Sequence, residues 1–162
     1  FLMKYYFLII IFLINQNVFS SELSCIFEEV HQNGDTHQGT LIIKDDKFRY
    51  EYFSHNLYTI IHKDNLFFYV ENRDKTKYFK ISKNIDLLES IVNIIGDFPS
   101  IKQEYYINDS LIKVEYSKTD KIIKRIIVLS NELKMSVYLN DCKDTPLKDI
   151  YFSWSPFWQY NH

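Results

Sequence analysis

The sequence predicts an α+β fold that is mainly antiparallel β, with about ten strands in a strongly curved, incomplete barrel and one central helix. Two observations predict it. From residue 25 onward, short apolar or alternating runs recur at hairpin spacing between turns rich in Asn, Asp, Ser and Lys. The pattern changes once, over residues 84–95, where apolar residues recur at helical spacing. A sheet this long in one domain has to curl or close, so the helix is expected to cover its concave face or plug a mouth, as a lid.

The expected strands follow one another along the chain as a meander. The strongest turn signal is the Asn-Gly-Asp of residues 33–35, between the first two runs. Residues 47–53 alternate, so that Phe48 and Tyr50 share one face of the sheet while Lys47 and Arg49 share the other. The runs that we interpret as strands are residues 25–32, 37–44, 47–53, 57–62, 66–71, 76–81, 105–107, 111–116, 122–129, 133–139 and 148–154.

Residues 84–95 carry the signals of a helix. Asn84 is a suitable N-cap and Gly96 a stop signal, while Leu88, Ile91 and Ile95 lie on one broad apolar face. Together with a curved sheet, such a helix would enclose an apolar space in which an acyl chain fits. The alternative is an ordinary filled core, which the periodicity by itself favours.

The first twenty residues are typical of an export signal. Lys4 precedes an apolar run over residues 5–14, too short for the roughly 20 residues that span a bilayer. Val18 and Ser20 suit the small-residue positions before a cleavage site. We therefore predict a signal peptide over residues 1–20 and a single domain over residues 21–162, with an uncleaved N-terminal anchor as the alternative.

Cys25 and Cys142 are the two cysteines of the chain and lie near opposite ends of the predicted domain. Exported proteins fold in an oxidising compartment, so we predict a disulfide between them. The alternative is that Cys142 is a nucleophile, but Asp141 and Asp144 beside it disfavour a thiolate.

Composition and charge argue against several classes of function. Three glycines leave no Gly-rich phosphate cradle, and a net charge of −2 argues against nucleic-acid binding. His31 and His37 flank a turn but lack a third ligand at metal-binding spacing, and no serine sits in a nucleophile elbow. We expect a non-enzymatic protein without a metal, a cofactor or a nucleic-acid partner.

Residues 39–52, GTLIIKDDKFRYEY, resemble a motif of the LolA family of periplasmic carriers of outer-membrane lipoproteins. In that family the segment typically reads Gly-x-Leu-x-(Ile/Leu)-Lys-Arg-Pro-x-x-Phe-Arg-(Trp/Phe)-Glu-Tyr. Residues 57–70 and 127–139 resemble later strands of the family. Two features depart from it, because a shortened Asp45-Asp46 replaces Arg-Pro and most of the family's N-terminal helix is missing. The matching residues are Gly39, Leu41, Lys44, Phe48, Arg49, Tyr50, Glu51 and Tyr52.

The resemblance implies a periplasmic carrier that binds acyl chains of lipoproteins or lipids beneath a helical lid and passes them to the outer membrane. Its partners would be those acyl chains and transfer proteins of the inner and outer membranes, and we expect a monomer. Lys44 and Arg49 are the candidate gate residues. The residues expected to line the cavity are Leu41, Ile43, Phe48, Tyr50, Tyr52, Ile60, Phe68, Leu88, Ile91 and Ile95.

Two other functions fit the same sequence. One is an exported sensor of hydrophobic ligands on the same fold. The other is a structural domain with a filled core, which would dock a partner through the aromatic residues of the C-terminal tail, Trp154, Phe157, Trp158 and Tyr160.

Overall fold

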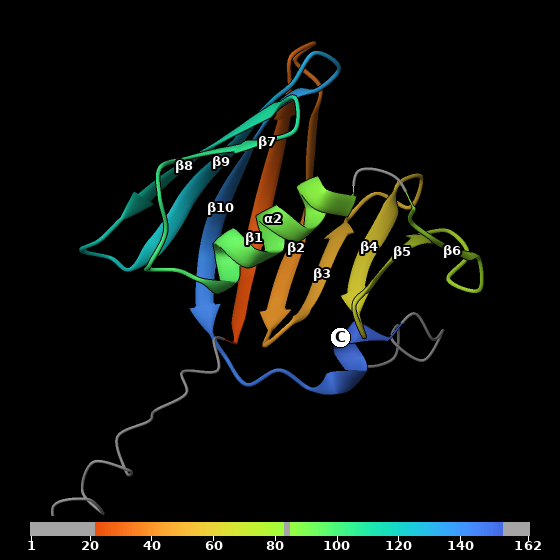
Figure 1. The fold of residues 1–162 in the computed structure, drawn as a ribbon. Coiled ribbons are helices and arrows are strands. Elements are labelled where there is room, and N and C mark those ends of the chain that lie inside the picture. Colours follow the sequence, from red (N-terminus) through yellow and green to blue (C-terminus); the bar gives the residue numbers. More distant parts are fainter. Residues whose placement is uncertain (1–21, 83–84, 154–162) are drawn as a thin grey trace, which may run out of the picture.

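The computed structural model describes residues 22–82 and 85–153, which form ten antiparallel strands and one α-helix (Figure 1). The predicted signal peptide, the Asn84 cap and the four tail aromatics lie outside these residues. No helix in the described part of the chain is long and apolar enough to cross a membrane. The strands are β1 (Leu23–His31), β2 (Thr36–Lys44), β3 (Lys47–Tyr52), β4 (Tyr58–Lys63), β5 (Leu66–Glu71), β6 (Tyr78–Lys80), β7 (Glu104–Ile107), β8 (Ser110–Ser117), β9 (Ile122–Leu129) and β10 (Lys134–Asp144).

All ten strands belong to one sheet in the order β6-β5-β4-β3-β2-β1-β10-β9-β8-β7. The sheet therefore consists of two meanders, β1 to β6 and β7 to β10, joined where the first strand pairs with the last. The edge strands β6 and β7 do not pair with each other, so the sheet curves without closing (Figure 1). This confirms the predicted open, mainly antiparallel sheet with a single helix inserted between its two halves.

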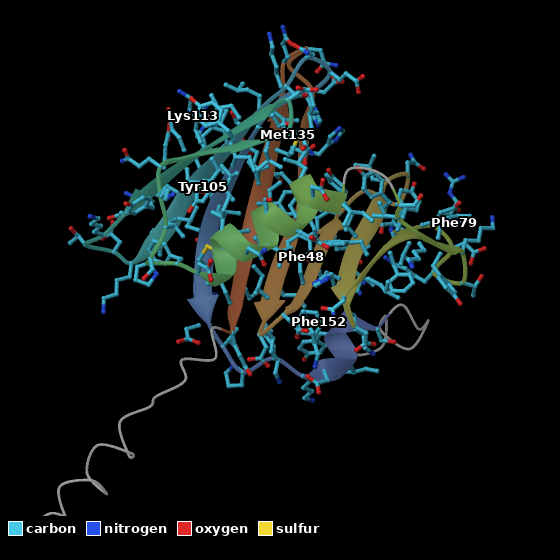
Figure 2. All side chains as sticks on the ribbon, viewed as in Figure 1. Phe48, Phe79, Tyr105, Lys113, Met135 and Phe152 are labelled. Atoms are coloured by element: carbon cyan, nitrogen blue, oxygen red, sulfur yellow. A yellow bond between two sulfur atoms is a disulfide. The ribbon has the colours of Figure 1, made fainter. Side chains whose placement is uncertain are left out.

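The prediction of an eleventh strand, over residues 148–154, is wrong. Asp149–Phe152 instead form a 3₁₀-helix, η1, which packs on the outer face of the sheet near β3 and β4. Phe152 is fully buried there against Ile42 and Leu147 (Figure 2). The backbone of η1 bonds locally, from Tyr151 N to the carbonyl oxygen of Lys148 and from Ser153 N to that of Ile150, and packing of Phe152 outweighs the β-like alternation of the segment.

The helix α2 (Ile85–Gly96) crosses the inner face of the sheet (Figure 1). Its two halves are buried to different extents. Val92, Ile94 and Ile95 are buried, whereas Leu87 and Leu88 remain only half-buried. The C-terminal half is therefore packed into the core, and the apolar side chains of the N-terminal half are packed less tightly.

Strand register places aromatic residues of β3 on the inner face, as predicted. Tyr52 pairs with Gly39, and Gly39 pairs in turn with Phe27 of β1. A Cβ atom at Gly39 would collide with the Phe27 ring and the carbonyl oxygen of Glu51. Gly39 therefore provides the space in which the Phe27 ring lies, stacked on Tyr50 with centroids 3.8 Å apart.

We expect Gly39→Ala to lower the free energy of unfolding by about 1–3 kcal/mol, because the added methyl group overpacks this contact. Urea titration followed by fluorescence measures the change. Gly96→Ala is the matched control, since nothing lies within 4 Å of its would-be Cβ atom. Equal stability of the two variants would contradict the close approach.

Cys25 and Cys142 form a disulfide, as predicted, with a sequence separation of 117. The bridge joins β1 to β10, the two strands that connect the meanders. It lies beside a β-bulge, since the register of the two strands shifts between Ser24 and Ile26. The covalent bond therefore reinforces the pairing at a place where the ladder of hydrogen bonds is irregular.

Replacing both cysteines with alanine is expected to lower the free energy of unfolding by up to about 4–5 kcal/mol, because the bridge restricts a long loop in the unfolded chain. Denaturant unfolding with and without reductant measures the effect. The reductant should destabilise the unsubstituted protein and leave the double variant unchanged. A midpoint that reductant does not move in the unsubstituted protein would contradict this role.

Candidate functional site

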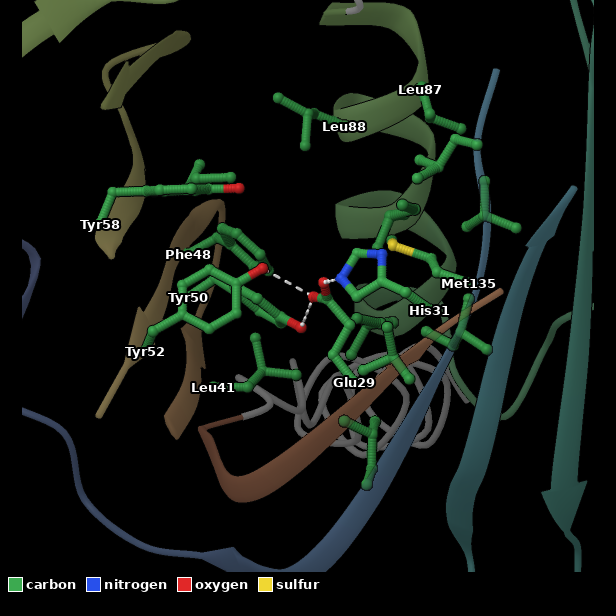
Figure 3. A pocket seen from close by; sticks show the side chains of 18 residues that line it. Glu29, His31, Leu41, Phe48, Tyr50, Tyr52, Tyr58, Leu87, Leu88 and Met135 are labelled. Atoms are coloured by element: carbon green, nitrogen blue, oxygen red, sulfur yellow. Dashed lines mark hydrogen bonds and ion pairs between the residues drawn. The ribbon is translucent and has the colours of Figure 1, made fainter. Parts of the chain in front are cut away.

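An apolar cavity of about 340 Å³ lies between α2 and the inner face of the sheet (Figure 3). Its volume falls within the range of about 300–1,000 Å³ that is typical of small-molecule sites. Both meanders contribute to its wall, since Leu41 lies on β2 and Val128 on β9. The half-buried side chains Leu87, Leu88 and Ile91 of α2 cover it.

Aromatic rings form the wall of the cavity on the side of the first meander. Tyr50 lies between Phe27 and Phe48, with both neighbouring rings nearly parallel to it. Tyr52 meets Tyr58 edge-on, with centroids 5.1 Å apart. Such ring contacts are favourable beyond their burial and leave few rotamers free, so this wall is rigid.

A single buried carboxylate interrupts this apolar lining. Glu29 is only 3% exposed, and its Oε2 accepts hydrogen bonds from Tyr50 Oη at 2.8 Å and Tyr52 Oη at 2.7 Å (Figure 3). Its Oε1 lies 2.5 Å from His31 Nε2. The three partners stabilise the carboxylate in a place where an unpaired charge would be very costly.

Both phenols of this cluster remain neutral hydrogen-bond donors. Burial, followed by the nearby charge of Glu29, raises the pKa of Tyr50 well above its usual value near 10. The same two causes also raise the pKa of Tyr52. The cluster is therefore one carboxylate held by two tyrosines and an imidazole, here called the Glu29 cluster (Glu29, His31, Tyr50 and Tyr52).

Two further hollows adjoin the cavity, one at each end of α2. The hollow at the N-terminal end has a volume of about 540 Å³, is largely polar, and shares Leu87 and Leu133 with the cavity. The hollow at the C-terminal end, of about 460 Å³, shares Ile95 and Leu139 with it. The cavity thus shares lining residues with a hollow at each end of the helix.

Eight of the ten residues expected to line the cavity do so in the structure. Ile43 instead lines the hollow at the C-terminal end of α2. The prediction that Phe68 lines the cavity is wrong. Phe68 pairs with Ile61, so both side chains lie on the outer face, opposite to Ile60. Side chains of a strand alternate between the two faces of the sheet, so a one-residue error in the expected register places each side chain on the opposite face. The eight are Leu41, Phe48, Tyr50, Tyr52, Ile60, Leu88, Ile91 and Ile95.

Sequence reasoning missed the Glu29 cluster as a unit. The signal was available on β1, where Cys25, Phe27 and Glu29 lie at alternating, inward positions. A carboxylate in such a position indicates a buried polar site. The wall contributed by the second meander was also missed, although residues 133–139 alternate clearly; its members are Ile126, Val128, Leu133, Met135, Val137 and Leu139.

The candidate gate residues are placed wrongly for a gate. Lys44 and Arg49 lie on the outer face, because they alternate with the inward side chains of Ile43 and Phe48. Lys44 Nζ donates to the carbonyl oxygen of Leu147 at 2.7 Å. Both residues therefore hold the C-terminal segment against the sheet, on the side opposite to the helix.

Arg49 belongs to a buried ionic network on this outer face. The side chain is 2% exposed, its Nε donates to Glu51 Oε2 at 2.7 Å, and its Nη1 donates to the carbonyl oxygen of Ser153 at 3.1 Å. Lys75 Nζ lies 3.0 Å from the other oxygen of Glu51. Although burial alone would raise the pKa of Glu51, the charges of Arg49 and Lys75 lower it.

No protein-family model and no curated protein matches the chain. A solved structure from Thermus thermophilus, described as an uncharacterized conserved protein, is similar, with a TM-score of 0.52 and 9% sequence identity. The match covers 91% of this chain and 92% of that one. At such identity the likeness shows a common fold over nearly the whole chain and carries no information on a ligand.

Glu51→Gln is expected to destabilise the protein by about 3 kcal/mol near neutral pH, because it leaves Arg49 and Lys75 buried without their counter-charge. The pKa of Glu51 is lower in the folded state than in the unfolded chain. Its ionised carboxylate therefore stabilises the fold at pH values above the unfolded-state pKa, and this stabilisation is lost as the pH falls through the folded-state pKa. The gap between variant and parent should therefore narrow below about pH 4.5, the ordinary value for this group.

Urea unfolding at a series of pH values measures that gap. Glu115→Gln is the matched control, since Glu115 pairs with Arg125 at 3.5 Å on an exposed part of β8. A gap for Glu51→Gln that is no larger than that of the control, or that does not change with pH, would contradict the stabilising network.

Proposed function

We propose that this protein is an exported carrier that binds the acyl chains of lipoproteins or lipids beneath α2 for transfer to the outer membrane. The observation that carries the proposal is the apolar cavity between the helix and the sheet. The resemblance of residues 39–52 to the LolA family supports the same function. The disulfide fits an oxidising compartment such as the periplasm.

The cavity is suited to a hydrocarbon chain in both composition and extent. Acyl chains gain about 0.8 kcal/mol for each methylene that leaves water, so an apolar enclosure provides affinity without directional contacts. The hollow beyond Ile95 and Leu139 extends the space beneath the helix. A chain longer than the central cavity can hold would continue into it.

In this proposal α2 acts as a lid, and its N-terminal half is the part that moves. Leu87, Leu88 and Ile91 are half-buried above the cavity, whereas Val92, Ile94 and Ile95 pack firmly. Lifting the N-terminal half would therefore break fewer contacts than lifting the C-terminal half. With Lys44 and Arg49 on the outer face, the lid opens without a gate formed by those residues.

Native mass spectrometry of the protein purified without detergent tests the proposal. We expect a bound mass that fragments to a phospholipid or an acylated peptide, because the apolar cavity retains its ligand in water. Protein that stays free of ligand, even after incubation with phospholipid vesicles, would contradict carriage.

Two tryptophan variants separate the cavity from the rest of the surface. Ile91→Trp should reduce the ligand-bound fraction at least about tenfold, since an indole ring takes up much of the cavity. Ile150→Trp is the control, because Ile150 lies on η1 on the outer face. An equal bound fraction in both variants would place the ligand elsewhere.

A further inference from the structure

The Glu29 cluster lies on the wall of the apolar cavity, and the polar hollow at the N-terminal end of α2 adjoins that cavity at Leu87 and Leu133. His31 pairs with Met135 on β10, and Leu133, two residues before Met135 in the chain, lines both spaces. In the other direction Phe27 pairs with Leu139, which borders the hollow at the C-terminal end. An amphiphile whose chain lies in the cavity and extends towards Leu139 would have its polar end beside the Glu29 cluster.

Three donors occupy the Glu29 carboxylate, which offers about four lone-pair positions. Tyr50 and Tyr52 both donate to Oε2, while Oε1 receives His31 Nε2 alone among the described residues. One acceptor position therefore remains at Oε1, on the side of His31. The His31 side chain is partly exposed and, like Glu29, lines the cavity, so this side of the carboxylate faces the proposed ligand.

The ionisable side chains that line the hollow next to the cavity are acidic. The adjoining hollow carries three carboxylates, those of Asp86, Asp109 and Glu132. Neither the hollow nor the cavity has a lysine or arginine among its described lining residues. An anionic head group would meet repulsion here from every carboxylate, and a cationic one attraction.

We propose that the Glu29 cluster binds the head group of the carried amphiphile and that this head group bears a cationic nitrogen, such as a primary ammonium. The inference rests on the proposed acyl-chain binding and specifies the ligand class of that site. The ammonium donates a hydrogen bond to Glu29 Oε1 beside His31, while the hydrocarbon chain extends beneath α2. The aromatic wall and the two phenols hold the carboxylate in position for this contact.

Three amphiphiles with the same chain and different head groups test this assignment. Dodecylammonium, dodecanol and dodecanoate, each below its micelle concentration, would displace a neutral fluorescent naphthylamine dye from the purified protein near neutral pH. We expect dodecylammonium to displace the dye at about tenfold lower concentration than dodecanoate, because a charge-assisted hydrogen bond favours the cation. Dodecanol should fall between them.

Glu29→Gln removes the charge and keeps the size of the side chain. It should bring the three displacement midpoints to within about twofold of one another, mainly by weakening dodecylammonium. Glu28→Gln is the matched control on the same strand, since Glu28 faces outward and accepts a hydrogen bond from Gln38. It should retain the full preference for the cation.

The outcomes separate the two proposals. Equal midpoints for the three amphiphiles on the unsubstituted protein, or a preference for dodecanoate, would overturn the head-group assignment while leaving acyl-chain binding intact. This comparison needs no variant, so it decides the question even if Glu29→Gln fails to fold. Failure of all three amphiphiles to displace the dye, or of the dye to bind, would overturn the carrier function and the assignment with it.

Discussion

The pairing of β1 with β10 joins the two meanders into one sheet. Strands within each meander are neighbours in the chain and can pair locally. The β1–β10 pair instead brings together residues from the two ends of the described chain, such as Leu23 and Asp144. Without it, β7 to β10 would be a separate hairpin stack and α2 would have no second wall to rest against. The Cys25–Cys142 disulfide crosses the same pair of strands, so the covalent link lies where the chain-entropy cost of closure is largest.

Side chains alternate along each strand, so the two faces of this sheet carry different residues and make different contacts. On β3, Tyr50 and Tyr52 point inward to the cavity, while Arg49 and Glu51 point outward into an ionic network. The outward network holds the C-terminal segment through the backbone carbonyl of Ser153. Six residues of one strand thus contribute both to the wall of the candidate site and to the outer layer that supports it.

The carboxylates of Glu29 and Glu51 illustrate different uses of charge. Glu51 is balanced by Arg49 and Lys75, so its contribution is to the stability and attachment of the outer layer. Glu29 has neutral phenols and one imidazole for partners and lies beside an apolar space. A core selected for stability alone would favour an apolar residue at this position. Its presence is therefore the main support for the proposal that the cavity binds a polar group as well as a chain.

The sequence by itself predicted the open antiparallel sheet with ten of its strands, the central helix and the disulfide, because hairpin turns, side-chain periodicity and cysteine number can be read locally. It also identified most of the cavity wall contributed by residues 41–60, since alternation along β3 was unambiguous. Only the tertiary structure decided that Phe68 faces outward, because that depends on register between strands. It also decided that Lys44 and Arg49 bind the C-terminal segment, since those contacts join residues distant in the chain. The 3₁₀ turn at residues 149–152 and the meeting of Glu29 with Tyr50 and Tyr52 were likewise beyond local patterns, since both arise from contacts between segments distant in the chain.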